Sequence, residues 1–178
     1  MAQKATIHKA ELNITDLDRN YYKTHHLTVA QHPSETHERM MSRILCFALH
    51  ASDTLDFTRG LSTDSEPDLW QKSLSDEIEV WIELGQVDEK RIRQASHHAK
   101  QVFIYTYNER SANEWWKQIH NKINRYHNVH VLHITDDSLA RLTEMVNRGM
   151  QLHITIQDEI IQISNGNNNI EIALHHWM

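Results

Sequence analysis

The sequence predicts an α/β fold with a mixed sheet, a central βαβ crossover, flanking helices and antiparallel hairpins at both ends. Strand-like and helix-like segments alternate through the middle of the chain, whereas both ends carry β-compatible segments with no helix between them. The length of 178 residues and the hydrophobic content of 39% suit one ordinary core. We therefore expect residues 1–178 to form a single domain.

The N-terminal segments predict a hairpin followed by a helix. Residues 6–14 and 21–30 are β-compatible and are separated by a short polar stretch. Ser34 is a candidate N-cap for a helix whose apolar residues recur at helical spacing between positions 41 and 48. The polar segment 61–66 is expected to be a loop.

The rest of the chain predicts strands and helices with few interruptions. The expected elements are a strand at 78–84, a helix at 88–100, a strand at 102–107, a helix at 111–126, a strand at 129–134, a helix at 136–148, and strands at 151–157, 159–163 and 169–174. Strands joined by a helix pair in parallel, so the first three of these strands are expected to form the crossover.

Composition excludes several classes of function. Four glycines and two prolines leave no glycine-rich phosphate loop and no dinucleotide-binding fingerprint. The single cysteine cannot form an intrachain disulfide or a cysteine-built zinc site, which suits a reducing cytoplasm. No window approaches the roughly 20 apolar residues of a membrane span. We expect a cytoplasmic protein with no membrane partner.

The charge balance limits the choice of partner. The net charge is −6 with the 15 histidines neutral, so a strongly basic surface for nucleic acid is absent, although a local basic patch would suffice for contact. The histidines do not follow the His-Glu-x-x-His pattern of a zinc site. No oligomeric state is predicted.

Two carboxylates form the most informative pattern. Asp68 follows a turn-forming proline, and Glu83 lies near the end of an apolar strand, on the same face as Trp81. An unpaired charge at position 83 would be costly to bury. If Asp68 lies on the neighbouring segment, the two carboxylates can share a hard cation such as Mg²⁺, which orients water and stabilises charge on a phosphodiester.

Several short motifs carry a resemblance to a known family. They are His32-Pro33-Ser34-Glu35, Glu38-Arg39-Met40-Met41, Phe57-Thr58-Arg59-Gly60, Trp81-Ile82-Glu83-Leu84-Gly85 and Trp115-Trp116. With them the chain resembles, over nearly its whole length, the YaeQ family of small bacterial proteins, a variant of the PD-(D/E)xK nuclease superfamily. The resemblance implies a restriction-endonuclease-like fold and a Mg²⁺-dependent nuclease.

The resemblance also implies roles for individual residues. Pro67-Asp68 matches the first half of the nuclease motif and Glu83 the second, but Gly85 stands where the motif has a lysine. An acidic residue on the first helix commonly completes the metal site in this fold, which favours Glu38. Hydrolysis would then use Asp68, Glu83 and Glu38 as metal ligands.

Basic and amide side chains near the motif are candidates for the missing lysine and for phosphate contacts. Lys90 and Arg91, at the start of the helix after Glu83, are the candidates to replace the lysine. Helical periodicity places Lys90 opposite the apolar stripe and Arg91 at its flank. Arg59 and Gln86 are candidates to contact phosphate.

Each candidate also has a purely structural explanation. Glu38 would stabilise the first helical turn through the helix dipole, and Asp68 would cap a turn. Glu83 would be satisfied by a buried salt bridge to Arg91 or Arg93. The competing hypothesis is therefore a catalytically inactive fold that serves as a regulatory module binding a protein or a nucleic acid.

Overall fold

The structure is a computed structural model that describes residues 3–59 and 65–178. Most of the loop expected at 61–66, together with Gly60, lies outside the described residues. The chain forms two compact units, and both are assembled from separate stretches of sequence. Unit 1 comprises Met1–Ile44 and Asp137–Ala173, and unit 2 comprises Leu45–Asp136 and Leu174–Met178. The single domain expected from the sequence stays a prediction.

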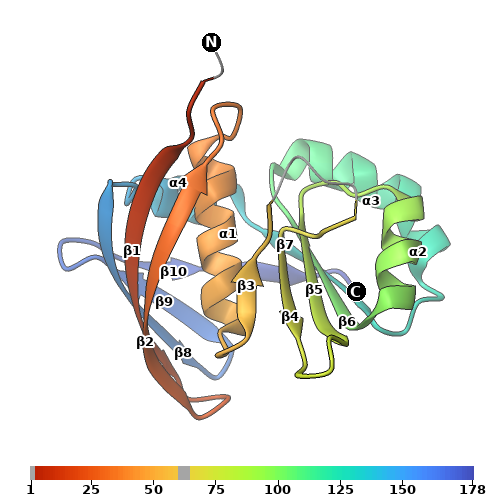
Figure 1. The fold of residues 1–178 in the computed structure, drawn as a ribbon. Helices are drawn as coiled ribbons and strands as arrows, with labels where there is room; N and C mark the ends of the chain where they lie inside the picture. The colour runs from red at the N-terminus through yellow and green to blue at the C-terminus, as the bar shows by residue number, and fades with distance from the viewer. Residues whose placement is uncertain (1–2, 60–64) are drawn as a thin grey trace. The chain divides into compact units, whose positions relative to one another are not determined.

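Unit 1 is built on a five-stranded mixed sheet in the order β10-β9-β8-β1-β2 (Figure 1). Its strands are β1 (Thr6–Asp16), β2 (Tyr21–Gln31), β8 (Gly149–Gln157), β9 (Ile160–Ser164) and β10 (Asn169–Ile172). The first and second strands form the expected N-terminal hairpin, and β1 also pairs in parallel with β8. Buried and exposed residues alternate along β8, so one face of this sheet is apolar and the other is polar.

Unit 2 is built on a six-stranded mixed sheet in the order β11-β7-β6-β5-β4-β3. Its strands are β3 (Leu55–Phe57), β4 (Leu69–Lys72), β5 (Ile78–Leu84), β6 (Ala99–Thr106), β7 (Val129–Ile134) and β11 (Leu174–His176). The three central strands, β5, β6 and β7, are parallel, and the helices α2 (Glu89–His98) and α3 (Glu109–Ile123) connect them. This confirms the predicted βαβ crossover.

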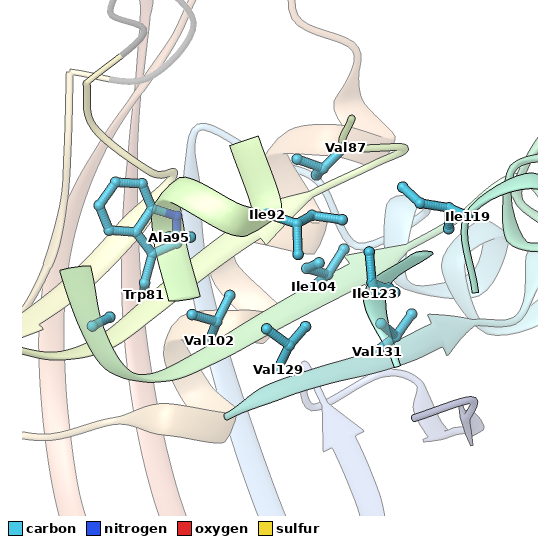
Figure 2. Packing of buried hydrophobic residues seen from close by; sticks show 11 residues of the cluster. Trp81, Val87, Ile92, Ala95, Val102, Ile104, Ile119, Ile123, Val129 and Val131 are labelled. Carbon is cyan, nitrogen blue, oxygen red and sulfur yellow. The ribbon is translucent and has the colours of Figure 1, made fainter. Parts of the chain in front are cut away.

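The core of unit 2 lies between its central strands and these two helices. Figure 2 shows Ile92 and Ala95 of α2 and Ile119 and Ile123 of α3 facing valine and isoleucine side chains of β6 and β7. Trp81 belongs to the same cluster and is 2% exposed. Burial of these apolar side chains fixes α2 against the sheet to which the strand carrying Glu83 belongs, which determines where the side chains of α2 can reach.

Two other helices differ from the sequence prediction. Helix α1 (His37–His50) begins after Thr36, whose hydroxyl accepts the Arg39 N–H at 3.2 Å, whereas the hydroxyl of Ser34 pairs with His32. Thr36 is therefore the capping residue, and the expected N-cap at Ser34 is wrong. Helix α4 (Asp136–Thr143) is shorter than the predicted 136–148.

The strand predicted at 169–174 is divided into two. Strand β10 pairs with β9 in unit 1, whereas β11 pairs with β7 in unit 2. Between them the Ala173 N–H donates to the Ser138 hydroxyl at 2.8 Å. This side-chain acceptor satisfies a backbone group that has no partner strand. No helix in the described ranges is long and apolar enough to cross a membrane.

Candidate functional site

Glu83 is a buried carboxylate close to the C-terminal end of β5. It is 5% exposed, and its neighbours Ile82 and Leu84 point to the opposite face of the sheet. The indole Nε1 of Trp81 donates to Glu83 Oε1 at 2.9 Å. The prediction that Trp81 and Glu83 share one face of the strand is thus confirmed.

Asp68 lies beside the same end of β5. It directly precedes β4, its backbone N–H donates to the Ile82 carbonyl at 3.0 Å, and its Oδ2 accepts the Leu84 N–H at 2.8 Å. These bonds bring Asp68 next to the segment that carries Glu83, although the two residues are well separated in sequence. Asp68 is also 5% exposed, so two carboxylates are buried near one another.

Arg91 provides the positive charge at this site. Its Nε lies 2.6 Å from Glu83 Oε1, and its Nη2 donates to the Glu66 carbonyl at 2.6 Å. Asp88, the N-cap of α2, accepts the Arg91 backbone N–H at 2.8 Å and so fixes the start of the helix. The salt bridge to Arg91 that the sequence offered as an explanation for Glu83 is present, whereas Arg93 is exposed.

The protonation of Glu83 reflects these surroundings. Burial raises the pKa of the Glu83 carboxyl above its ordinary value of 4.5. The charge of Arg91 lowers this pKa, the charge of Asp68 raises it, and the hydrogen bonds from Trp81 and Arg91 lower it. Burial prevails, so the pKa of Glu83 is raised overall, and a further positive charge at the site would stabilise the ionised form.

Gly85 directly follows β5 and has a backbone conformation that favours glycine. Its φ is +90°, and its N–H donates to the Tyr105 carbonyl at 2.9 Å. A Cβ added at this position would meet no atom within 4 Å, so the constraint comes from the backbone and not from crowding. The position where the resemblance to nucleases leads one to expect a lysine is thus one where any Cβ is strained.

The other predicted residues lie at the surface. Lys90 is exposed, as helical periodicity predicted, and Gln86 is exposed and donates through Nε2 to the Tyr107 carbonyl at 2.9 Å. Arg59 is exposed at the edge of the described residues, where its backbone N–H donates to Glu66 Oε2 at 3.2 Å. Glu38 belongs to unit 1 and is exposed in the first turn of α1, so its role as a ligand stays a prediction.

The structure therefore brings together Asp68, Glu83 and Arg91. Sequence reasoning did not give Trp81 a hydrogen-bonding role, although its place two residues before Glu83 could have suggested one. It also missed the Glu66 carbonyl, because a backbone acceptor leaves no signal in the sequence. No group of three or more histidine, cysteine, aspartate or glutamate side chains in the described part of the chain could hold a metal ion.

A pair of carboxylates is nevertheless a suitable donor set for Mg²⁺. This cation prefers oxygen ligands, keeps several of its waters and is commonly held by only one or two carboxylates. Both hydrogen bonds from described residues to the Glu83 carboxylate end on Oε1. Oε2 thus accepts no hydrogen bond from a described residue and is the oxygen better placed to bind a cation.

Comparison with known proteins identifies the family. The profile of the YaeQ protein family matches residues 1–174. The chain belongs to the YaeQ family. It is 45% identical over 177 residues to the protein named "Uncharacterized protein YaeQ" of Escherichia coli. The match covers 99% of this chain and 98% of that protein. The protein of the same name from Salmonella typhi is 46% identical over 177 residues, with the same coverage.

Solved structures of YaeQ proteins share this architecture. The crystal structure of the YaeQ protein from Xanthomonas axonopodis pv. citri matches with a TM-score of 0.94 and 40% identity over 98% of both chains. That of the Pseudomonas syringae YaeQ protein matches with a TM-score of 0.93 and 34% identity over 98% of this chain and 96% of the other. The mixed α/β architecture with two mixed sheets is therefore that of YaeQ proteins.

Proposed function

We propose that this YaeQ protein is a metal-dependent phosphodiesterase that acts on nucleic acid. In this proposal Asp68 and Glu83 hold a Mg²⁺ ion, and Arg91 takes the place of the lysine missing from the PD-(D/E)xK motif. The observation that carries the proposal is the convergence of the two buried carboxylates with one guanidinium at the end of β5. The restriction-endonuclease-like fold implied by the resemblance belongs to the same proposal.

The carboxylate pair supports binding of a divalent cation. Two buried negative charges beside a single arginine leave the site with a net charge of −1 when both are ionised, and the raised pKa of Glu83 reflects its burial and the charge of Asp68. A bound Mg²⁺ would supply Lewis-acid activation of a water and charge stabilisation at the phosphate. Asp68 Oδ2 is fixed by the Leu84 N–H, so this carboxylate is already oriented before any ligand arrives.

Arg91 suits the role of the missing lysine. A guanidinium remains charged at all physiological pH values and can bind a phosphate through two parallel hydrogen bonds. Helix α2 begins four residues after Gly85, and the Arg91 side chain reaches back from it to Glu83. In the proposed reaction Arg91 positions the phosphodiester and neutralises the charge that develops on it.

Exposed cations near Arg91 support a polyanionic substrate. Lys90 and Arg93 lie on the same helix, are exposed, and form no side-chain ion pair with any residue of the described part of the chain. Such unpaired charges are available to nearby phosphates even though the whole protein is acidic. A nucleic acid supplies phosphates on both sides of the bond to be cut.

A nuclease assay tests the proposal. Wild-type protein, Asp68→Asn and Glu83→Gln are incubated with single- and double-stranded DNA and RNA at fixed Mg²⁺ or Mn²⁺ concentration. We expect each substitution to lower the cleavage rate at least about 100-fold. Glu79→Gln is the matched control, because Glu79 lies on the same strand but bonds Gln71 at 3.0 Å, away from the site. Loss of activity in the control alone, or equal activity in all variants, contradicts the assignment.

One observation favours the second candidate, a regulatory module that binds without cutting. Glu83 Oε1 is bonded by Trp81 and Arg91 without any metal, which is the arrangement of a structural ion pair. This candidate predicts binding of nucleic acid or protein that is independent of Mg²⁺ and unchanged by Glu83→Gln. Binding assays in the presence of a chelator distinguish it from the enzyme.

A further inference from the structure

We infer that Arg91 is a displaceable counter-ion, which competes with the divalent cation for Glu83 and is released towards the phosphodiester when the cation binds. This inference rests on the proposed function and concerns the order of events at the same site. It assigns to one side chain two successive partners, Glu83 in the metal-free protein and phosphate in the complex with substrate.

The contacts of Arg91 allow this exchange. The backbone of α2 is fixed by the Asp88 cap and by burial of Ile92 and Ala95, so the exchange requires movement of the side chain only. The Arg91 side chain is 25% exposed, whereas that of Glu83 is 7% exposed. The Arg91 side chain therefore has solvent to move into once its Nη2 also gives up the 2.6 Å bond to the Glu66 carbonyl, whereas the Glu83 carboxylate has none.

The charges at the site cause Arg91 and the divalent cation to weaken each other's binding to Glu83. Asp68, Glu83 and Arg91 sum to −1 without metal and to +1 with a divalent cation. Once the cation is bound, its repulsion weakens the hold of Glu83 on Arg91, and by reciprocity Arg91 weakens the binding of the cation. The 2.6 Å contact from Arg91 Nε and the 2.9 Å contact from Trp81 both end on Oε1, so a cation held by Glu83 would compete with Arg91 for the charge of one carboxylate.

This double role predicts opposite effects of one substitution on binding and on turnover. Removing the guanidinium strengthens cation binding, because the competitor is gone, and slows cleavage, because the phosphate loses its partner. A purely structural ion pair behaves differently, because its loss disturbs the position of Glu83 and weakens cation binding.

The test is calorimetric titration of metal-free protein with Mn²⁺ at fixed ionic strength. We expect Arg91→Gln to bind Mn²⁺ about tenfold more tightly than wild type, while its cleavage rate at saturating Mn²⁺ falls. Lys90→Gln is the matched control, because it makes the same change of charge on the neighbouring residue of the same helix, and Lys90 makes no contact with Glu83. Its affinity for Mn²⁺ should stay close to that of wild type.

The outcomes separate this inference from the proposed function. If wild type, Arg91→Gln and Lys90→Gln bind Mn²⁺ equally well, Arg91 does not compete with the cation and the inference is wrong, whereas the metal site of the proposed function is still supported. If none of them binds millimolar Mn²⁺, the metal site is wrong and the inference fails with it. Should Arg91→Gln not fold, Arg91→Met is used instead, because it also removes the charge and keeps a long apolar stem. Tighter Mn²⁺ binding by this variant is then the expected result, and unchanged or weaker binding overturns the inference.

Discussion

Trp81 and Glu83 lie two residues apart on one face of β5, and the indole Nε1 of the first donates to Oε1 of the second at 2.9 Å. A hydrogen bond to a buried charged group contributes more than one between neutral groups, about 1.5–3 kcal/mol. We expect Trp81→Phe, which keeps an aromatic ring in the core, to lower the free energy of unfolding by about 2 kcal/mol.

Chemical denaturation at neutral pH measures this effect. Trp70→Phe is the matched control, since the Trp70 ring packs edge-on against Trp81 at 6.4 Å and its indole donates to no described residue. Equal losses in the two variants would show that the cost arises from packing and not from the bond to Glu83.

Gly85 is expected to resist replacement by the lysine that the proposed nuclease motif would have at this position. At φ +90° a side chain costs about 1–2 kcal/mol through backbone strain. Gly85→Lys and Gly85→Ala should therefore both lower the midpoint of thermal unfolding, and Gly85→Lys should not raise nuclease activity. Gly149→Ala is the control, because a Cβ added to Gly149 would also meet open space while the φ of this residue is not positive. Its stability should change little.

His133 is expected to make unit 2 sensitive to acid. Burial lowers the pKa of its imidazole below the ordinary 6.5, nearby His175 lowers it further, and Asp136 and Glu109 oppose the shift. Because the unfolded chain takes up a proton first as the pH falls through 6.5, the contribution of His133 to stability is lost below that pH. The free energy of unfolding should fall with decreasing pH by at most about 1.4 kcal/mol per pH unit through this residue.

His133→Phe tests this dependence. In the described residues His133 Nε2 is the buried side-chain polar atom that has no hydrogen-bond partner, and the ring stacks on Trp177 with centroids 4.8 Å apart. Phenylalanine keeps the stacking and removes the titration, although Thr106 loses its 2.9 Å partner. The free energy of unfolding, measured at several pH values between about pH 7 and pH 5, should depend less on pH in this variant than in wild type. An unchanged slope would exclude His133 as the source.

Glu35 and Glu38 are expected to differ sharply although they are close in sequence. Glu35 is buried and accepts two hydrogen bonds from Arg43, at 2.8 and 2.7 Å, whereas Glu38 is exposed. Glu35→Gln should lower the free energy of unfolding by about 3 kcal/mol, because it removes the negative charge that compensates the buried Arg43 guanidinium. Glu38→Gln should cost less than about 1 kcal/mol, and a larger loss would contradict its placement at the surface.

The sequence predicted the central elements of the fold better than the short ones. Strands 78–84 and 129–134 were predicted with their observed boundaries, because their apolar runs are bounded by polar residues. Strands β3 and β4 were not predicted, since three and four residues are too few to show a periodic pattern. The division at Ala173 was also missed, because a change of sheet within one apolar run leaves no turn residue behind.

The candidate site could be predicted in part, because some of its residues lie on strands and helices with a regular pattern. Alternation along a strand predicted that Trp81 and Glu83 share a face, and helical periodicity put Arg91 at the flank of α2 and Lys90 on its outer side. The choice between Arg91 and Arg93 as the partner of Glu83 depended on how α2 packs, which the pattern of apolar residues does not specify.

The parallel pairing of β1 with β8 has a consequence for synthesis of the chain. Lys9 pairs with Gly149, and the His8 imidazole bonds the Asn147 carbonyl across 139 positions of sequence. The sheet of unit 1 therefore cannot be completed until nearly the whole polypeptide has left the ribosome, and the β1–β2 hairpin is exposed in the meantime. Contacts so distant in sequence slow folding, and a hairpin without its third strand is marginally stable. In nascent chains halted before β8, the strands of unit 1 should accordingly depend on chaperones, whereas β5, α2 and β6 of unit 2 already make the local contacts of the crossover.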